Sequence, residues 1–284
     1  MKTRLISSGI AVALALVIII LGSYFNIVVT IALSLVSVIL CGEYLSARKL
    51  NKNFAVFFTC LFFALIIPLT SYMKEPFDRF RFIPMFLFVL LMCIYSVVFH
   101  RKLPLEDVMF ALVGESIITV CLSLLNVIVW TDAGSGAPPE ARHTAFWIIF
   151  TLAIPWLADS GAYFAGVYFG KRKLCPDISP HKTVEGAIGG ILTGTISALL
   201  IGFIFKLVYG QVTIYYGVLV LVAFINSIVS IFGDLIFSIV KRSCKIKDFG
   251  SIMPGHGGLL DRFDSVLFCI PVVYIFAQSF YFIM

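Results

Sequence analysis

Long apolar runs separated by short polar stretches follow one another along almost the whole chain. Each run is close to the roughly 20 residues that a helix needs to cross the hydrocarbon core of a bilayer. The pattern predicts an all-α, polytopic transmembrane helix bundle of about nine spans. The predicted spans are residues 5–21, 25–42, 54–72, 83–99, 107–130, 145–169, 185–208, 212–239 and 265–283.

Composition supports a membrane protein and limits the number of domains. Of the 284 residues, 61% are hydrophobic and 13% are charged, and the mean hydropathy is +1.06. These values are typical of membrane proteins rather than soluble ones. Because the loops are short, we predict a single membrane domain over 1–284, with apolar spans in 1–143 and the candidate site in 144–284. The cysteines form no CxxC pair, so neither a disulfide framework nor a zinc site is expected.

The basic residues predict which side of the membrane each loop occupies. With nine spans and a cytoplasmic N-terminus, all but five of the 21 Lys and Arg residues fall on the cytoplasmic side, as the positive-inside rule requires. The polar loops 170–184 and 240–264 then face the cytoplasm, where nucleotides are available. The net charge of +6 suits a basic rim that attracts anionic headgroups. No basic domain outside the membrane supports nucleic-acid binding.

Ionisable residues within the spans, or at their ends, are candidates for function. A charge at a helix centre costs about 2.5–3.5 kcal/mol on insertion scales, so it is kept where it faces protein or water. The residues are Glu115, Asp159, Glu185 and Asp234. Asp159 could face a substrate or pair with a basic residue of a neighbouring loop.

One predicted span carries a polar stripe at four-residue intervals, which lies along a single helical face. The stripe consists of Asn226, Ser230, Asp234 and Ser238. We expect this face to look into the bundle. Asn226 and Ser230 suit hydrogen bonding between helices, whereas the Asp234 carboxylate needs a cation, which favours a functional role.

The loop Ser179-Pro-His-Lys-Thr-Val-Glu-Gly186 leads into a predicted helix. Lys182 could reach a phosphate beside the helix start, where backbone amides favour anions. The alternative is a simple capped helix start with Thr183 as the cap. Beyond it, Gly186, Gly190 and Gly194 form a small-residue stripe that predicts close helix packing.

The segment 238–264 concentrates charge between two apolar runs. Asp261 and Asp264 share a face if the last helix begins there, although acids in this pattern also cap helices. With Asp234 they make three carboxylates, and carboxylates among cations describe a site for Mg²⁺-bound polyphosphate. The nearby cations are Lys241, Arg242, Lys247 and Arg262. The glycines Gly255, Gly257 and Gly258 would let backbone amides approach phosphate oxygens, and His256 could carry a proton or be a turn residue.

Several of these elements together resemble the signature of the CDP-diacylglycerol synthases, also called phosphatidate cytidylyltransferases. The resemblance rests on Ser238-x-x-Lys241-Arg242, Lys247-Asp248 and His256-Gly-Gly-Leu-x-Asp261-Arg-Phe-Asp264. It extends to Gly233-Asp234, to Ser179–Gly186 and to Asp159–Tyr163, and so covers roughly the C-terminal half. Met253 departs from the Leu, Ile or Phe that is more frequent in the family at this position.

The resemblance implies an enzyme that makes CDP-diacylglycerol and pyrophosphate from CTP and phosphatidate in phospholipid synthesis. It implies that Asp234, Asp261 and Asp264 hold Mg²⁺, with room for a monovalent cation such as K⁺, and that Lys241 acts with them in catalysis. The implied substrate-binding residues are Asp159, Ser179, Lys182, Glu185, Arg242, Lys247, Asp248, His256 and Arg262. The expected setting is a multi-pass protein of a bacterial inner membrane or an equivalent one, with a site facing the cytoplasm and with room for a homodimer.

Two other functions remain open at this stage. A CTP-dependent polyprenol or lipid kinase would use the same nucleotide and metal but would transfer the γ-phosphoryl group and release CDP. An ion-coupled membrane transporter would also keep acidic residues within its spans, but it would not explain the charge in 238–264. The DGxxAR pattern of CDP-alcohol phosphotransferases is absent.

Overall fold

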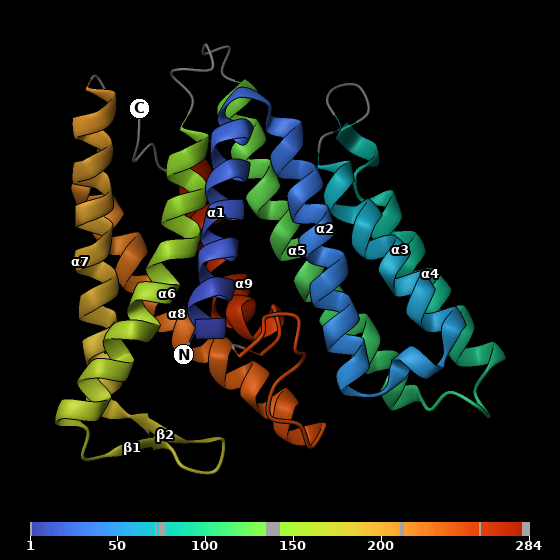
Figure 1. Ribbon diagram of the computed structural model, residues 1–284. Helices are drawn as coiled ribbons and strands as arrows, with labels where there is room; N and C mark the ends of the chain where they lie inside the picture. Colours follow the sequence, from blue (N-terminus) through green and yellow to red (C-terminus); the bar gives the residue numbers. More distant parts are fainter. Residues whose placement is uncertain are drawn as a thin grey trace. The chain divides into compact units, whose positions relative to one another are not determined.

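The computed structural model describes residues 2–71, 73, 78–134, 143–210, 213–255 and 257–279 (Figure 1). Within these ranges it contains nine α-helices, two short 3₁₀ helices and one two-stranded antiparallel sheet. The α-helices are α1 (Lys2–Tyr24), α2 (Asn26–Ala47), α3 (Phe54–Thr70), α4 (Ile83–Val98), α5 (Leu105–Gly134), α6 (Thr144–Phe169), α7 (Val184–Tyr209), α8 (Tyr216–Ser243) and α9 (Leu260–Ser279). The remaining elements are η1 (Leu50–Lys52), η2 (Asp78–Phe80), β1 (Lys173–Cys175) and β2 (Ser179–Thr183).

Each predicted span corresponds to one of these helices, which confirms the all-α fold. Five helices in the described part are long and apolar enough to cross a membrane: α2, residues Leu105–Trp130 of α5, α6, α7 and α8. Shorter apolar helices cover Ala13–Tyr24, Phe54–Thr70 and Ile83–Val98. A membrane helix bundle is therefore supported, while the count of nine spans and the cytoplasmic N-terminus stay predictions.

The chain forms two compact units. The first comprises Met1–Arg142 and Ile246–Asp261, and the second comprises His143–Lys245 and Arg262–Met284. The boundary falls within the first turn of α9, so that this helix begins in one unit and continues in the other.

A polar network joins three helices of the first unit. Thr30 of α2 donates a hydrogen bond to Asn126 Oδ1 of α5 at 2.9 Å, and Asn126 Nδ2 donates to the carbonyl oxygen of Pro68 in α3 at 3.1 Å. Trp130 Nε1 donates to Thr30 Oγ1 at 2.8 Å. Because Thr30 and Asn126 are fully buried, these bonds satisfy polar groups that have no access to water.

Replacing Asn126 with Ala is expected to destabilise the protein, because it leaves the Pro68 carbonyl and the Thr30 hydroxyl without this partner. Loss of a buried hydrogen-bonding partner costs about 1–3 kcal/mol. Thermal unfolding in detergent measures the effect. Val120→Ala is the matched control, since Val120 lies on the same helix and is 39% exposed. Equal melting temperatures for the two variants would contradict the structural role of this network.

Arg48 joins the end of α2 to the start of α5. Its Nε lies 2.5 Å from Asp107 Oδ1, and its Nη2 lies 3.2 Å from Glu106 Oε2. The guanidinium carbon also lies 5.3 Å from the centre of the Phe110 ring, within cation–π range. The hydrogen bond to Asp107 raises the pKa of Arg48 above its ordinary value. This basic residue at the edge of the bundle thus has a structural role.

Glycines let α6 and α7 pack closely in the second unit. A Cβ atom on Gly186 would lie 2.8 Å from the Ala162 carbonyl oxygen, and one on Gly190 would lie 2.8 Å from the Ala158 carbonyl oxygen. These backbone atoms cannot move aside easily, so only glycine allows this approach. The predicted packing role of the glycine stripe is confirmed.

The segment between α6 and α7, expected to be a loop over 170–184, contains the hairpin β1–β2 (Figure 1). Lys173 pairs with Thr183 and Cys175 pairs with Ser179. The hairpin brings the end of α6 to the first residue of α7.

Candidate active site

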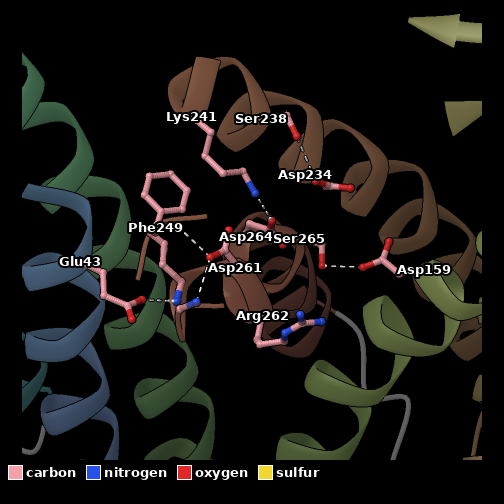
Figure 2. Close-up of polar contacts among 12 residues, drawn as sticks. Glu43, Asp159, Asp234, Ser238, Lys241, Phe249, Asp261, Arg262, Asp264 and Ser265 are labelled. Carbon is pink, nitrogen blue, oxygen red and sulfur yellow. Dashed lines mark hydrogen bonds and ion pairs between the residues drawn. The ribbon is translucent and has the colours of Figure 1, made fainter. Parts of the chain in front are cut away.

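Carboxylates and lysines gather in the second unit, from α6, β2, α8 and α9. Figure 2 shows Asp159, Asp234, Lys241 and Asp264 of this cluster. Lys182 Nζ of β2 lies 2.5 Å from Asp234 Oδ2 of α8. Lys241 Nζ, two turns further along α8, lies 3.7 Å from Asp264 Oδ2 of α9. Two lysines thus form ion pairs with two aspartates, and in each pair the two partners come from different elements.

The polar stripe of α8 leads to this cluster. Asn226 and Ser230 are fully buried, which confirms the prediction that this face looks into the bundle. Ser238 Oγ donates a hydrogen bond to Asp234 Oδ1 at 3.3 Å, as Figure 2 shows. About a quarter of the Asp234 side chain is exposed, so its carboxylate lies where a polar ligand can reach it.

Asp264 is a buried carboxylate, only 6% exposed. Its Oδ1 accepts a hydrogen bond from the backbone N–H of Ser265 at 2.8 Å, and its other oxygen faces Lys241. Asp159 and Asp234 also interact electrostatically with Asp264 as like charges. Such repulsion is reduced by cations, which the two lysines supply here.

Gly233 explains how Asp264 can lie so close to α8. A Cβ atom at this position would lie 2.9 Å from the Asp264 carbonyl oxygen and 3.2 Å from Ser265 Cα. The absence of a side chain therefore allows the first turns of α9 to approach α8 beside Asp234.

Replacing Gly233 with Ala is expected to push α9 away from α8 and to lower activity, since overpacking costs about 1–3 kcal/mol. Gly217→Ala on the same helix is the matched control, because a Cβ there would meet nothing within 4 Å. The measurements are turnover and melting temperature. Wild-type turnover in Gly233→Ala would show that the close approach of α8 and α9 is unimportant for the site.

Asp159 of α6 joins the cluster through α9. Its Oδ2 accepts a hydrogen bond from Ser265 Oγ at 3.0 Å (Figure 2). One turn earlier on α6, Trp156 Nε1 donates to the Arg262 carbonyl oxygen at 2.8 Å. Asp159 thus contacts α9 through Ser265, and its substrate-binding role stays a prediction.

The segment from β2 to α7 has the capped helix start that was considered as an alternative. Thr183 Oγ1 accepts a hydrogen bond from the Gly186 N–H at 3.1 Å, as an N-cap residue does. Glu185 Oε2 accepts from the N–H groups of Lys171 and Arg172 at 3.0 and 3.2 Å. Thr183 thus caps the helix, as the alternative expected, and Lys182 pairs with Asp234, while its contact with a phosphate stays a prediction. The contacts of Glu185 are with backbone, and its substrate-binding role stays a prediction.

The remaining predicted residues lie at the surface or in the first unit. Arg242 and Arg262 are exposed in the second unit, Lys247 and Asp248 are exposed in the first, and Ser179 is half-buried in β2.

Asp261 belongs to the first unit, where its Oδ2 accepts hydrogen bonds from the N–H groups of Phe249 and Gly258 at 2.9 and 3.0 Å. His256 lies outside the described residues. The amide of Gly258, expected to approach a phosphate, is thus bound by a protein carboxylate.

Comparison with known proteins identifies the family. The model of the Cytidylyltransferase family matches residues 2–280. The chain belongs to this family. The relatives include phosphatidate cytidylyltransferases from Bacillus subtilis (strain 168), 40% identical over 186 residues, from Haemophilus influenzae, 40% over 148 residues, and from Staphylococcus epidermidis (strain ATCC 12228), 44% over 127 residues. The alignments cover 66%, 50% and 45% of this chain, and 64%, 48% and 47% of the respective relatives.

A cytidylyltransferase works on phosphate groups, and the donor set suits a phosphate-bound Mg²⁺. No three His, Cys, Asp or Glu side chains of the described residues are grouped to hold a metal by themselves. Mg²⁺ is usually held by one or two carboxylates, with substrate phosphates as further ligands. Asp234 and Asp264 supply such oxygens, and each faces a lysine that could instead pair with a phosphate.

Glu43 has buried contacts that the sequence did not indicate. It lies in the first unit, one residue beyond a predicted span, and is 6% exposed. Its carboxylate accepts two backbone N–H groups near the start of α9. The available signal was a single acidic residue at the end of an apolar run, and such a residue is usually solvated.

Proposed function

We propose that this chain is a phosphatidate cytidylyltransferase, which converts CTP and phosphatidate into CDP-diacylglycerol and pyrophosphate. The observation that carries the proposal is the paired lysine–carboxylate cluster of Lys182, Asp234, Lys241 and Asp264 in a member of the Cytidylyltransferase family. The relatives named phosphatidate cytidylyltransferase indicate the acceptor.

The reaction is a single displacement at phosphorus. A phosphate oxygen of phosphatidate forms a bond to the α-phosphorus of CTP, and the bond from that phosphorus to the oxygen bridging the α- and β-phosphates breaks. Pyrophosphate leaves with the bonding electrons. The attacking phosphate monoester is already anionic near neutral pH, so no general base is needed to activate it. Catalysis then consists of positioning and of stabilising negative charge.

The chain's own residues can supply both the positioning of the substrates and the stabilisation of negative charge. Lys182 and Lys241 can exchange their carboxylate partners for substrate phosphates, and the exposed Arg242 and Arg262 can bind further oxygens. Asp234 and Asp264 would hold Mg²⁺ on the side that the lysines vacate. When bound, Mg²⁺ would neutralise charge on the nucleotide phosphates. Asp261, which lies one helical turn before Asp264 on α9, stays a predicted ligand, as does a monovalent cation.

A membrane location suits these substrates. Phosphatidate resides in the bilayer and CTP in the cytoplasm, so the site must lie at their boundary. The positive-inside distribution supports a multi-pass protein with a cytoplasmic N-terminus and a site on the cytoplasmic face. A homodimer stays a prediction.

The experiment that tests the acceptor compares lipids. Purified protein in detergent receives CTP labelled in the cytosine ring, Mg²⁺, and either phosphatidate or a diacylglycerol, which lacks the attacking phosphate. We expect label in the lipid phase with phosphatidate only. Absence of lipid-soluble cytidine with phosphatidate would overturn the proposal.

A further inference from the structure

Glu43 binds the start of a helix that lies far from it in the sequence. In the first unit, its Oε1 accepts a hydrogen bond from the Leu259 N–H at 3.0 Å, and its Oε2 accepts from the Leu260 N–H at 2.7 Å (Figure 2). Leu260 is the first residue of α9. The first amides of a helix have no partner within it and carry partial positive charge. A buried carboxylate is therefore a strong partner for them.

Two glycines make room for this carboxylate. A Cβ atom on Gly258 would lie 2.6 Å from Glu43 Oε2 and 2.7 Å from the Gly250 backbone nitrogen. A Cβ atom on Gly250 would clash with Glu43 Oε1 and lie 2.8 Å from its Cδ. Gly250 and Gly258, eight residues apart in the chain, thus both pack against the Glu43 side chain. Gly258, expected to admit a phosphate, admits the Glu43 carboxylate.

Other contacts hold the same segment together, and one joins it to α2. Asp261 accepts the N–H groups of Phe249 and Gly258, so two carboxylates together bind four backbone amides of the segment. The buried Phe249 ring lies 6.3 Å, centre to centre, from the ring of Tyr44, which follows Glu43 on α2. The segment is therefore anchored at Phe249 and again at residues 258–261.

Backbone amides are the main partners of the Glu43 charge. Within the described part of the chain, Glu43 forms no ion pair with Lys, Arg or His. Its two acceptor oxygens match the two N–H groups that the segment presents.

We propose that Glu43 is a positioning residue, which holds the described part of segment 246–261 in a shape that lets the exposed Lys247 pair with a phosphate of CTP. This segment carries Lys247, Asp248 and Asp261, and Asp264 follows on the same helix. In this role Glu43 acts through the segment that it binds. The inference rests on the proposed function and adds to it a residue from the N-terminal half of the chain, where no motif was found.

The test compares Glu43→Gln and Glu43→Ala with Glu106→Gln, a control in the same unit whose side chain is 85% exposed. Trypsin cleavage after the exposed Lys247 is followed without ligand and with increasing CTP and Mg²⁺. The KM for CTP, kcat and melting temperature are measured beside it. Gln keeps one acceptor but turns an NH₂ group toward a backbone donor, whereas Ala removes both acceptors.

We expect a graded series. Glu43→Gln should speed cleavage and raise the KM for CTP several-fold, and Glu43→Ala should do so by about tenfold or more, the change that 1.4 kcal/mol produces. The control should match the wild type. Protection from trypsin should require correspondingly more CTP, and kcat should change less than KM. If Glu43→Ala fails to fold, the Gln variant decides.

Cleavage rates and CTP affinities of the Gln variant equal to those of Glu106→Gln would overturn the proposal. A lower melting temperature with unchanged CTP affinity would also overturn it, since Glu43 would then serve stability alone. Cleavage in the absence of ligand does not depend on the reaction. It therefore reports on the anchoring even if the wild type fails to use phosphatidate, a result that would count against the proposed function and not against the anchor.

Discussion

Asp234→Asn is expected to lower cytidylyl transfer by a factor of about 10²–10³ or more while the protein stays folded. Asn has the same shape and can still accept the hydrogen bond from Ser238, but it carries no negative charge for Lys182 or Mg²⁺. The ion pair is about one-quarter exposed on each side, so its loss should cost no more than about 1 kcal/mol of stability. A large loss of turnover with a small loss of stability is the signature of a site residue.

The measurements for this variant are turnover and the melting temperature in detergent. Asp177→Asn is the matched control, because Asp177 is an exposed aspartate in the turn of the β1–β2 hairpin. If Asp234→Asn keeps turnover within a few-fold of this control, then Asp234 is a structural partner of Lys182 and the proposed site is wrong.

Lys182→Met is expected to reduce kcat/KM for CTP by about 10²-fold, because it removes a cation that, in the proposed site, pairs with a substrate phosphate. Met preserves most of the length of the side chain, so packing between β2 and α8 changes little. Lys173→Met serves as the control, since Lys173 is an exposed lysine of the same hairpin.

Combining Lys182→Met with Asp234→Asn separates two roles of the pair. If the residues only neutralise each other, the double variant should recover activity relative to the single variants. The proposed site predicts no recovery, because each group also binds phosphate or metal. Recovery to near wild-type turnover would contradict it.

The helices were predictable because apolar runs of membrane length leave few alternatives for the backbone. Even α8 and α9 were located to within a few residues, although their ends are set by local contacts. The hairpin β1–β2 was not predicted, because strands of three and five residues in a polar segment produce no period of their own.

Most residues of the candidate site in the second unit could also be predicted from the sequence, because a charged residue is conspicuous in an apolar helix. Asp159 and Asp234 stand out as charges in apolar helices, and the lysines follow from the polar segments that flank them. The contact of Glu43 was not predictable, because its partners are backbone N–H groups 216 and 217 residues away. Backbone donors look alike in every sequence, so only the fold reveals which carboxylate binds them.

The most direct test of the account follows the two ends of the triphosphate. Wild-type protein is given phosphatidate, Mg²⁺ and CTP labelled with ³²P at either the α- or the γ-phosphate, and the lipid and aqueous phases are separated. The account predicts that the α label enters the lipid and that the γ label leaves as pyrophosphate. Transfer of the γ label to lipid, with release of CDP, would contradict it and would identify a lipid kinase.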